Sequence, residues 1–165
     1  MTSNATTKQV IIEKLGLEPH PSEGGYFKRS YTSTVEVNCE SGSRATLSSI
    51  YYMLTDDSPI GYLHKNKSDI IHYFHHGSPI DYFIIHRNGQ LEKVTLGNNL
   101  EKGHQLQLIV KGGCWKASEL KDGEYGLLSE AVSPGFEYED MELADRSIIQ
   151  KLYPAIVADI EKYIL

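Results

Sequence analysis

The chain has 165 residues and a formal net charge of −6 at pH 7. At this length one domain with a single core is the default, so we expect residues 1–165 to form one domain. The sequence has no basic run, which argues against a nucleic-acid partner, and no apolar run long enough to cross a bilayer. Residues 1–7 lack the basic-then-apolar pattern of a secretion signal, so we expect a cytoplasmic protein.

The first elements are a short helix, a loop and a strand. Segment 6–15 is predicted to be helical, because a threonine can cap its start, apolar residues share one side and Gly16 can end it. Two prolines and two glycines favour a loop over 18–25. A strand is then expected from Tyr26 to Tyr31.

The middle of the chain consists of short stretches rich in β-formers, separated by turn sequences. Asn88-Gly89 is the strongest hairpin signal among these turns. Many short strands at near-regular spacing indicate a sandwich or barrel. The predicted strands are 45–54, 70–74, 82–86, 91–96, 105–110, 115–118 and 125–132.

The C-terminal segment changes to a helical pattern. Pro154 suits a helix start, and apolar residues recur at helical spacing over 156–164. We expect this apolar stripe to pack on the barrel or on a second subunit.

The two cysteines do not form a recognisable functional pair. Cys39 and Cys114 lie far apart in the sequence, unlike the closely spaced pairs that hold zinc or act as redox dithiols. We expect two reduced thiols, since intracellular chains rarely keep a disulfide.

Four of the seven histidines lie between residues 64 and 77. Strand alternation places His72 on the same face as Ile70 and Phe74, which we expect to point into the barrel. His75 and His76, next to a glycine turn, are then expected to be solvated.

Three motifs occur in order along the chain: His20-Pro-Ser-Glu-Gly-Gly-Tyr-Phe, His64-Lys-Asn-Lys-Ser-Asp followed by a strand and Gly77, and Ser133-Pro-Gly-Phe-Glu-Tyr-Glu-Asp-Met-Glu-Leu-Ala. Together they resemble the Cupin_5 family, a domain of unknown function within the cupin superfamily. The resemblance implies a mostly β fold, the cupin double-stranded β-helix or jelly roll, with short N- and C-terminal helices. It also implies a small-molecule pocket at the open end and a homodimer.

The chain departs from the metal-binding pattern of many cupins. His64 matches one of the family's metal-binding histidines, but Tyr62, Ile70 and Lys116 occupy the other ligand positions. An open catalytic metal site normally needs about three protein ligands, so we expect neither a metal nor another cofactor. A weak metal held by His64 and His72 remains an alternative.

The central site candidates are His64, His72 and Lys116. A neutral imidazole can move protons near physiological pH, so the two histidines are the catalytic candidates. Lys116 can hold a carboxylate, a phosphate or a developing oxyanion. The structural alternative is that His72 bonds a backbone carbonyl in the core and Lys116 extends its amine to water.

Further ligand-binding candidates surround this group, partly because the family motifs place them near the open end. Ser48 and Tyr52 share one face of the 45–54 strand, and Ser49 and Tyr51 share the other, so the inward face stays open. The remaining candidates are Glu23, Gln107, Trp115, Glu137 and Glu139.

Three functions compete. The first is a metal-independent isomerase or epimerase acting on a sugar-like or carboxylate- or phosphate-bearing molecule, with a histidine base, a tyrosine acid and Lys116 as anchor. The second is a non-catalytic ligand-binding protein, and fold alone does not separate the two. The third, less favoured by the residues, is a metal-dependent phosphosugar isomerase or dioxygenase. The identity of the ligand and the pathway do not follow from the sequence.

Overall fold

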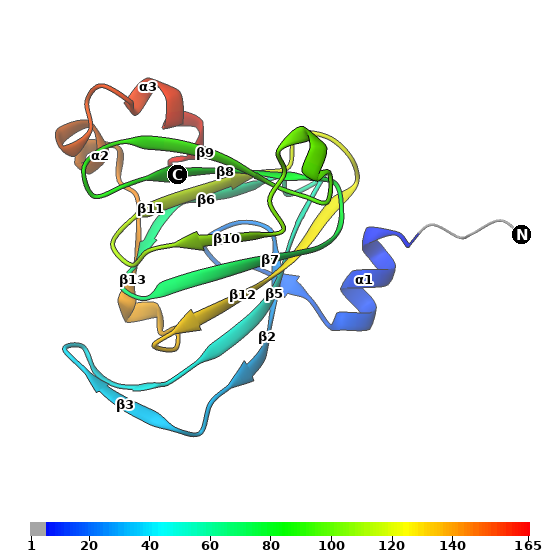
Figure 1. Ribbon diagram of the computed structural model, residues 1–165, viewed down its shortest axis with the longest axis horizontal. Coiled ribbons are helices and arrows are strands. Elements are labelled where there is room, and N and C mark those ends of the chain that lie inside the picture. Colours follow the sequence, from blue (N-terminus) through cyan, green and yellow to red (C-terminus); the bar gives the residue numbers. More distant parts are fainter. Residues whose placement is uncertain (1–5) are drawn as a thin grey trace, which may run out of the picture.

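The computed structural model describes residues 6–165, and it is built around two antiparallel β-sheets that face each other (Figure 1). The expected jelly roll is therefore confirmed. The six-stranded sheet has the order β1 (Glu18–Pro19), β2 (Tyr26–Thr32), β5 (Ser48–Thr55), β12 (Tyr125–Ser133), β7 (Asp69–Gly77) and β10 (Gln107–Val110). The five-stranded sheet has the order β13 (Met141–Leu143), β6 (Ile60–Asn66), β11 (Trp115–Glu119), β8 (Ile80–Ile85) and β9 (Leu91–Leu96).

The smaller elements extend this frame. A hairpin of β3 (Glu36–Cys39) and β4 (Gly42–Ala45) projects away from the sheets (Figure 1). The helical elements are α1 (Lys8–Leu15), η1 (Leu100–Lys102), η2 (Tyr138–Asp140), α2 (Arg146–Leu152), α3 (Val157–Ile160) and η3 (Glu161–Tyr163). Among residues 6–165, no helix is long and apolar enough to cross a membrane.

The main core lies between the two sheets, because strand alternation turns one apolar face of each sheet inward. Leu54 and Leu128 enter it from the six-stranded sheet, and Ile80, Ile84 and Leu96 enter it from the five-stranded sheet. All five side chains are at most 1% exposed. A layer of closely packed apolar side chains therefore supports the polar groups at one end of the barrel.

Two further clusters cover parts of the outer faces. Trp115 and Ile85, on the outer face of the five-stranded sheet, pack with Ile149, Ile160 and Tyr163 of the C-terminal segment. On the other side of the molecule, α1 packs through a cluster that includes Ile11, Met53 and Leu127 (Figure 1). The helices thus brace the sheets from outside.

The predicted strands are largely confirmed, but several elements differ. The structure adds β1, the hairpin β3–β4, β6 and β13, and β5 begins at Ser48 rather than at residue 45. The predicted C-terminal helix is present as α3 and η3, but it begins at Val157, because Pro154 lies in a turn. The structure also adds α2 before this turn. After β12, Phe136 and Glu137 lie in a loop that leads into η2.

Three further predictions concern the ends of the first helix, the two cysteines and the start of the chain. Thr7 caps α1 and Gly16 ends it in a left-handed conformation, as predicted. Cys39 and Cys114 are free thiols. The expected absence of a secretion signal concerns residues 1–7, of which 1–5 lie outside the described residues.

Strand register brings the polar residues together. Lys116 of β11 pairs with His64 of β6 in the five-stranded sheet. Glu130 of β12 pairs with His72 of β7 in the opposite sheet. Directly paired residues on antiparallel strands have neighbouring side chains, so each sheet presents one polar pair, and the two pairs face each other.

Candidate functional site

Lys116 reaches across the barrel and joins the two sheets. Its Nζ lies 2.7 Å from His72 Nε2 and 3.2 Å from each carboxylate oxygen of Glu130. His72 is fully buried, and the exposed fractions of Lys116 and Glu130 are 3% and 8%. The lysine does not extend to water, which corrects that half of the structural alternative.

Hydrogen bonds fix the charges in this group. His72 Nδ1 lies 3.2 Å from the Leu108 carbonyl and must donate to it, so Nε2 carries the lone pair that accepts from Lys116. Burial, together with Lys116, lowers the pKa of His72. Burial opposes ionisation of Glu130, but Lys116 and His72 outweigh it and hold the pKa of Glu130 well below the usual carboxyl range. The group therefore contains a buried ion pair beside a neutral imidazole.

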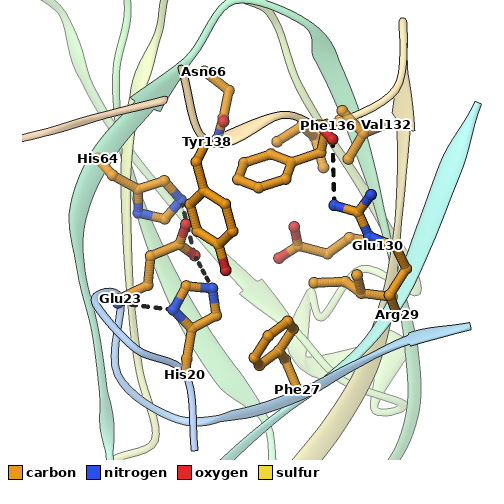
Figure 2. A pocket seen from close by; sticks show the side chains of 12 residues that line it. His20, Glu23, Phe27, Arg29, His64, Asn66, Glu130, Val132, Phe136 and Tyr138 are labelled. Carbon is orange, nitrogen blue, oxygen red and sulfur yellow. Dashed lines mark hydrogen bonds and ion pairs between the residues drawn. The ribbon is translucent and has the colours of Figure 1, made fainter. Parts of the chain in front are cut away.

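A second group, His20, Glu23 and His64, lies closer to the surface (Figure 2). Glu23 Oε2 lies 3.4 Å from His64 Nε2 and 3.7 Å from His20 Nε2. Burial raises the pKa of Glu23, and burial together with Lys116 lowers the pKa of His64 to about 4. Each shift favours the uncharged form of its group: the carboxylic acid at Glu23 and the neutral imidazole at His64.

The tautomers of the two imidazoles are opposite. His64 Nδ1 donates to the Tyr62 carbonyl at 2.7 Å, so its Nε2 has a free lone pair. His20 Nδ1 accepts from the backbone N–H groups of Ser22 and Glu23, so its proton is on Nε2. Glu23 Oε2 therefore faces a ring N–H on the His20 side and a lone pair on the His64 side.

The loop that carries Glu23 is held against both sheets. The Glu23 carbonyl accepts from the Tyr62 N–H at 2.7 Å, and the Gly24 carbonyl accepts from the Tyr52 hydroxyl at 3.0 Å. Gly24 has a φ of +81°, and a Cβ there would lie 2.2 Å from the Ile60 carbonyl oxygen. Glycine is therefore required for the loop to approach β6 so closely.

The second group forms the floor of a pocket that opens between the sheets. The space measures about 420 Å³ when open solvent at its mouth is included, but the free volume between the facing side chains is only about 30 Å³, enough for a water molecule or two. Its lining comprises His20, Glu23, Phe27, Arg29, Ile50, His64, Asn66, Ile70, Glu130, Val132, Phe136 and Tyr138.

The segment containing Phe136 and Tyr138 covers the mouth. The rings of these two residues pack edge to face at 5.1 Å, and Figure 2 shows the Tyr138 ring between His64 and Glu130 with the Phe136 ring beside it. The Phe136 N–H donates to Ser48 Oγ at 2.9 Å, and Arg29 donates to the Phe136 carbonyl at 3.2 Å. A ligand of sugar size therefore has to displace part of this cover.

The structure brings some of the predicted site residues to the pocket. His64 and Glu23 line it. His72, Lys116 and Tyr52 lie deeper, and Lys116 and Tyr52 border a smaller inner cavity that Glu23, His64 and Glu130 also border. Ser48 is 1% exposed and supports the cover rather than the floor. The inward face of β5 is the one that carries Ser48 and Tyr52.

Other predicted residues lie elsewhere. Trp115 packs on the outer face of its sheet, because it neighbours the inward-facing Lys116. Gln107 is exposed on the outer face of β10, while the adjacent Leu108 is buried. Glu137 and Glu139 are exposed, and Glu139 forms an ion pair with Arg44. His75 and His76 are exposed, as expected.

Five polar residues that line the pocket were not among the predicted site residues: His20, Arg29, Asn66, Glu130 and Tyr138. Glu130 had a recognisable signal, since it interrupts the apolar face formed by Leu128 and Val132 on a predicted strand. His20 begins a quoted family motif, and Tyr138 belongs to another. Asn66 lies on β6, which was not predicted.

The donor set does not fit the metal that many cupins hold. His20 cannot ligate through Nε2, because backbone donors occupy Nδ1 and leave the ring proton on Nε2. The Nε2 of His72 accepts from Lys116, whose ammonium group would repel a cation. Within residues 6–165, no group of three or more His, Cys, Asp or Glu side chains is arranged to hold a metal ion.

Comparisons with known proteins support the fold and the family. The family model described as Cupin superfamily (DUF985), Cupin_5, matches residues 9–144. An uncharacterized protein of Saccharomyces cerevisiae is 41% identical over 155 residues, covering 85% of this chain and 76% of the yeast protein.

Solved structures give the same result. A hypothetical protein from Leishmania major has a TM-score of 0.90 at 31% identity, covering 96% of this chain and 99% of that one. A Shewanella oneidensis protein has a TM-score of 0.87 at 30% identity, with coverage of 98% and 99%. Oxalate decarboxylase of Bacillus subtilis has a TM-score of 0.55 at 14% identity and is covered to 37% of its length, so it shows similarity of fold alone.

Proposed function

The chain belongs to the Cupin_5 family of the cupin superfamily, and on that basis we propose that its pocket binds a small polar molecule and moves a proton on it, as a metal-independent isomerase or epimerase. The observation that supports this proposal is the Glu23–His64 pair in the pocket floor. Glu23 Oε2 and His64 Nε2 lie 3.4 Å apart. The pKa of Glu23 is raised and that of His64 is lowered. Strongly shifted pKa values at a carboxyl and an imidazole that face each other in a pocket are typical of groups that act as acid and base.

The roles differ from those first assigned by sequence. His64 is the base in this proposal, because it lines the pocket and its Nε2 lone pair faces Glu23. His72 is less suited, since both of its ring nitrogens have partners in the core. Tyr138, whose ring lies over the floor in Figure 2, is the tyrosine placed to act as an acid from the mouth.

Lys116 supports the site indirectly in this mechanism. It does not line the pocket, and it neutralises Glu130, whose carboxylate does line it. Burial lowers the pKa values of His64 and His72, and the charge of Lys116 lowers them further. The lysine therefore helps to keep both imidazoles uncharged and does not contact the ligand.

The test has two steps. A thermal-shift screen of sugars, nucleotide sugars and organic acids identifies ligands, because binding to the folded state raises the melting temperature. Each ligand found is then incubated with the protein in D₂O, and deuterium incorporation at its carbon atoms is followed by mass spectrometry. We expect incorporation that falls by about 10²- to 10⁴-fold in His64→Gln, the usual contribution of a general base.

His86→Gln is the matched control, since His86 pairs with Glu92 on the surface away from the pocket. It should exchange as fast as the wild type. A ligand that binds without any carbon-bound exchange would contradict the enzyme and favour the alternative, a non-catalytic binding protein.

A further inference from the structure

The side-chain oxygen of Asn66 is a buried acceptor that no described residue satisfies. Among residues 6–165, Asn66 Oδ1 has no hydrogen-bond partner, although the residue is only 7% exposed. Asn66 stands two positions beyond His64 on β6, so both side chains are on the same face, and both line the pocket (Figure 2). Buried polar atoms are nearly always paired, so the contents of the pocket have to supply the donor.

Glu130 is a second acceptor, on the opposite sheet. Figure 2 shows its carboxylate directed into the pocket. Lys116 balances its charge from behind, at 3.2 Å from each oxygen. Glu130 can therefore accept further hydrogen bonds, but an anionic ligand group beside it would be repelled, and a cationic one would compete with Lys116.

Donors are scarce at the floor and present at the rim. The one ring N–H of His20 faces Glu23. The only arginine that lines the pocket, Arg29, is exposed, and none of the ion pairs found within residues 6–165 includes it. Its guanidinium donates to the Phe136 carbonyl and has further N–H groups to offer.

We propose that the floor receives the neutral hydroxyl groups of a polyhydroxylated ligand, which donate to Asn66 Oδ1 and Glu130, and that an anionic group on the ligand binds Arg29 at the rim. This inference rests on the proposed small-molecule pocket and narrows its ligand class. It replaces the expectation that Lys116 holds a carboxylate or phosphate, since Glu130 lies between Lys116 and the pocket.

Small probes test this without knowledge of the natural ligand. Erythritol, inorganic phosphate and methylammonium are titrated separately into ¹⁵N-labelled protein, and NMR follows the side-chain signals of Asn66, His64 and Arg29. Erythritol should shift the Asn66 and His64 signals saturably. Phosphate should shift only the Arg29 signal, and methylammonium should shift none of the three.

Variants assign the acceptor. Asn66→Leu keeps the size of the side chain and removes the hydrogen bond, so erythritol should bind about tenfold more weakly. Asn98→Leu, at an exposed asparagine, is the matched control and should bind as the wild type does. Asn66→Ala takes the place of Asn66→Leu if the leucine variant does not fold.

The outcomes separate this inference from the proposed function. The ligand assignment would be overturned if the NMR signals of Asn66 or His64 responded to phosphate or methylammonium. Unchanged erythritol binding in the Asn66 variants would overturn it as well. Either result would leave the proton-transfer proposal standing. A floor that responds to no probe, at concentrations up to the molar range, would overturn both.

Discussion

The protonation of His64 is set by its surroundings rather than by its own chemistry. An imidazole in water titrates near neutrality, but burial and the nearby Lys116 lower the pKa of His64 to about 4. The histidine therefore stays uncharged and can accept a proton. The same lysine helps to keep Glu130 ionised. One buried cation therefore affects the protonation of His64 in one sheet and of Glu130 in the other.

The lowered pKa of His64 predicts a pH dependence of stability. Between the folded value of about 4 and the ordinary value of 6.5, the unfolded chain binds more protons than the folded one. The unfolding free energy therefore rises with pH across this window, and the His64 contribution is lost as the pH falls from 6.5 toward 4. The expected contribution is about 3 kcal/mol.

Urea unfolding of the wild type and His64→Gln at several pH values between 4.5 and 7.5 measures this contribution. The unfolding free energy of the variant should rise less steeply with pH than that of the wild type. An equal rise in both proteins would mean that His64 has the same pKa in the folded and unfolded states.

The Lys116–Glu130 pair predicts strong coupling between two substitutions. Glu130→Gln leaves a buried ammonium without its carboxylate, and Lys116→Met leaves a buried carboxylate without its ammonium. Each should lower the unfolding free energy by about 3–5 kcal/mol. The double variant should lose less than the sum, because it removes both charges.

Chemical denaturation of the four proteins gives the coupling energy. Glu142→Gln is the control, since its partner Lys65 is 30% exposed, and it should cost no more than about 1 kcal/mol. If the loss of unfolding free energy in the double variant equalled the sum of the losses in Lys116→Met and Glu130→Gln, this result would contradict the geometry of the pair.

Part of the site could be predicted from single residues, and strand parity explains both the successes and the errors. His72 pointed inward because it shares a face with Ile70. By the same rule, Trp115 points away from a pocket that its neighbour Lys116 faces. The prediction of Trp115 as a ligand-binding residue was therefore wrong. Contacts between sheets, such as Lys116 with Glu130, depend on pairing across distant segments and could not be predicted from spacing alone.

At the scale of elements, the predictions succeeded where periodicity and turn chemistry were strong. The strand over Leu91–Leu96 follows the Asn88-Gly89 turn, and its bounds match the prediction. β6 was missed because its sequence mixes apolar residues with Gly61, His64 and Asn66, the composition of a strand that lines a pocket. The C-terminal helix was misplaced because apolar residues on either side of Pro154 pack on the same cluster.

The close approach of the Glu23 loop to β6 predicts an unusual cost for a small substitution. In Gly24→Ala the new methyl group would lie 2.2 Å from the Ile60 carbonyl oxygen, at a φ of +81°. Gly103→Ala has a similar φ of +80° but no atom within 4 Å, so it isolates the backbone strain. We expect Gly103→Ala to cost about 1–2 kcal/mol, and Gly24→Ala to cost more.

Melting temperatures and ligand binding of the two variants provide the measurement. Gly24→Ala should also impair binding, because it displaces Glu23. Equal costs in both variants would mean that the loop can move away from β6 without penalty.

At the scale of the whole molecule, the C-terminal helices belong to the fold although they follow the family match, which ends at residue 144. Ile149 and Ile160 are fully buried against the outer face of the five-stranded sheet, where Trp115 is 1% exposed. Figure 1 shows α2 and α3 on this side of the molecule. Removal of these helices would expose a continuous apolar surface.

A point substitution and a truncation test this role. Ile149→Ala should lower the unfolding free energy by about 2–5 kcal/mol, the range for truncating a large buried aliphatic side chain. A chain ending at residue 144 should be insoluble or should bind a hydrophobic dye. Native-like melting of the shortened chain would show that the helices are dispensable.

The opposite tautomers of His20 and His64 give the pocket a direction. At Glu23 Oε2, one neighbour can only give a proton and the other can only receive one. A ligand turned end for end would meet this arrangement reversed, with donors against donors. Under the proposed proton transfer, the two hydrogens of a prochiral methylene group should therefore be unequal, and mass spectrometry after incubation in D₂O should find that only one of them exchanges.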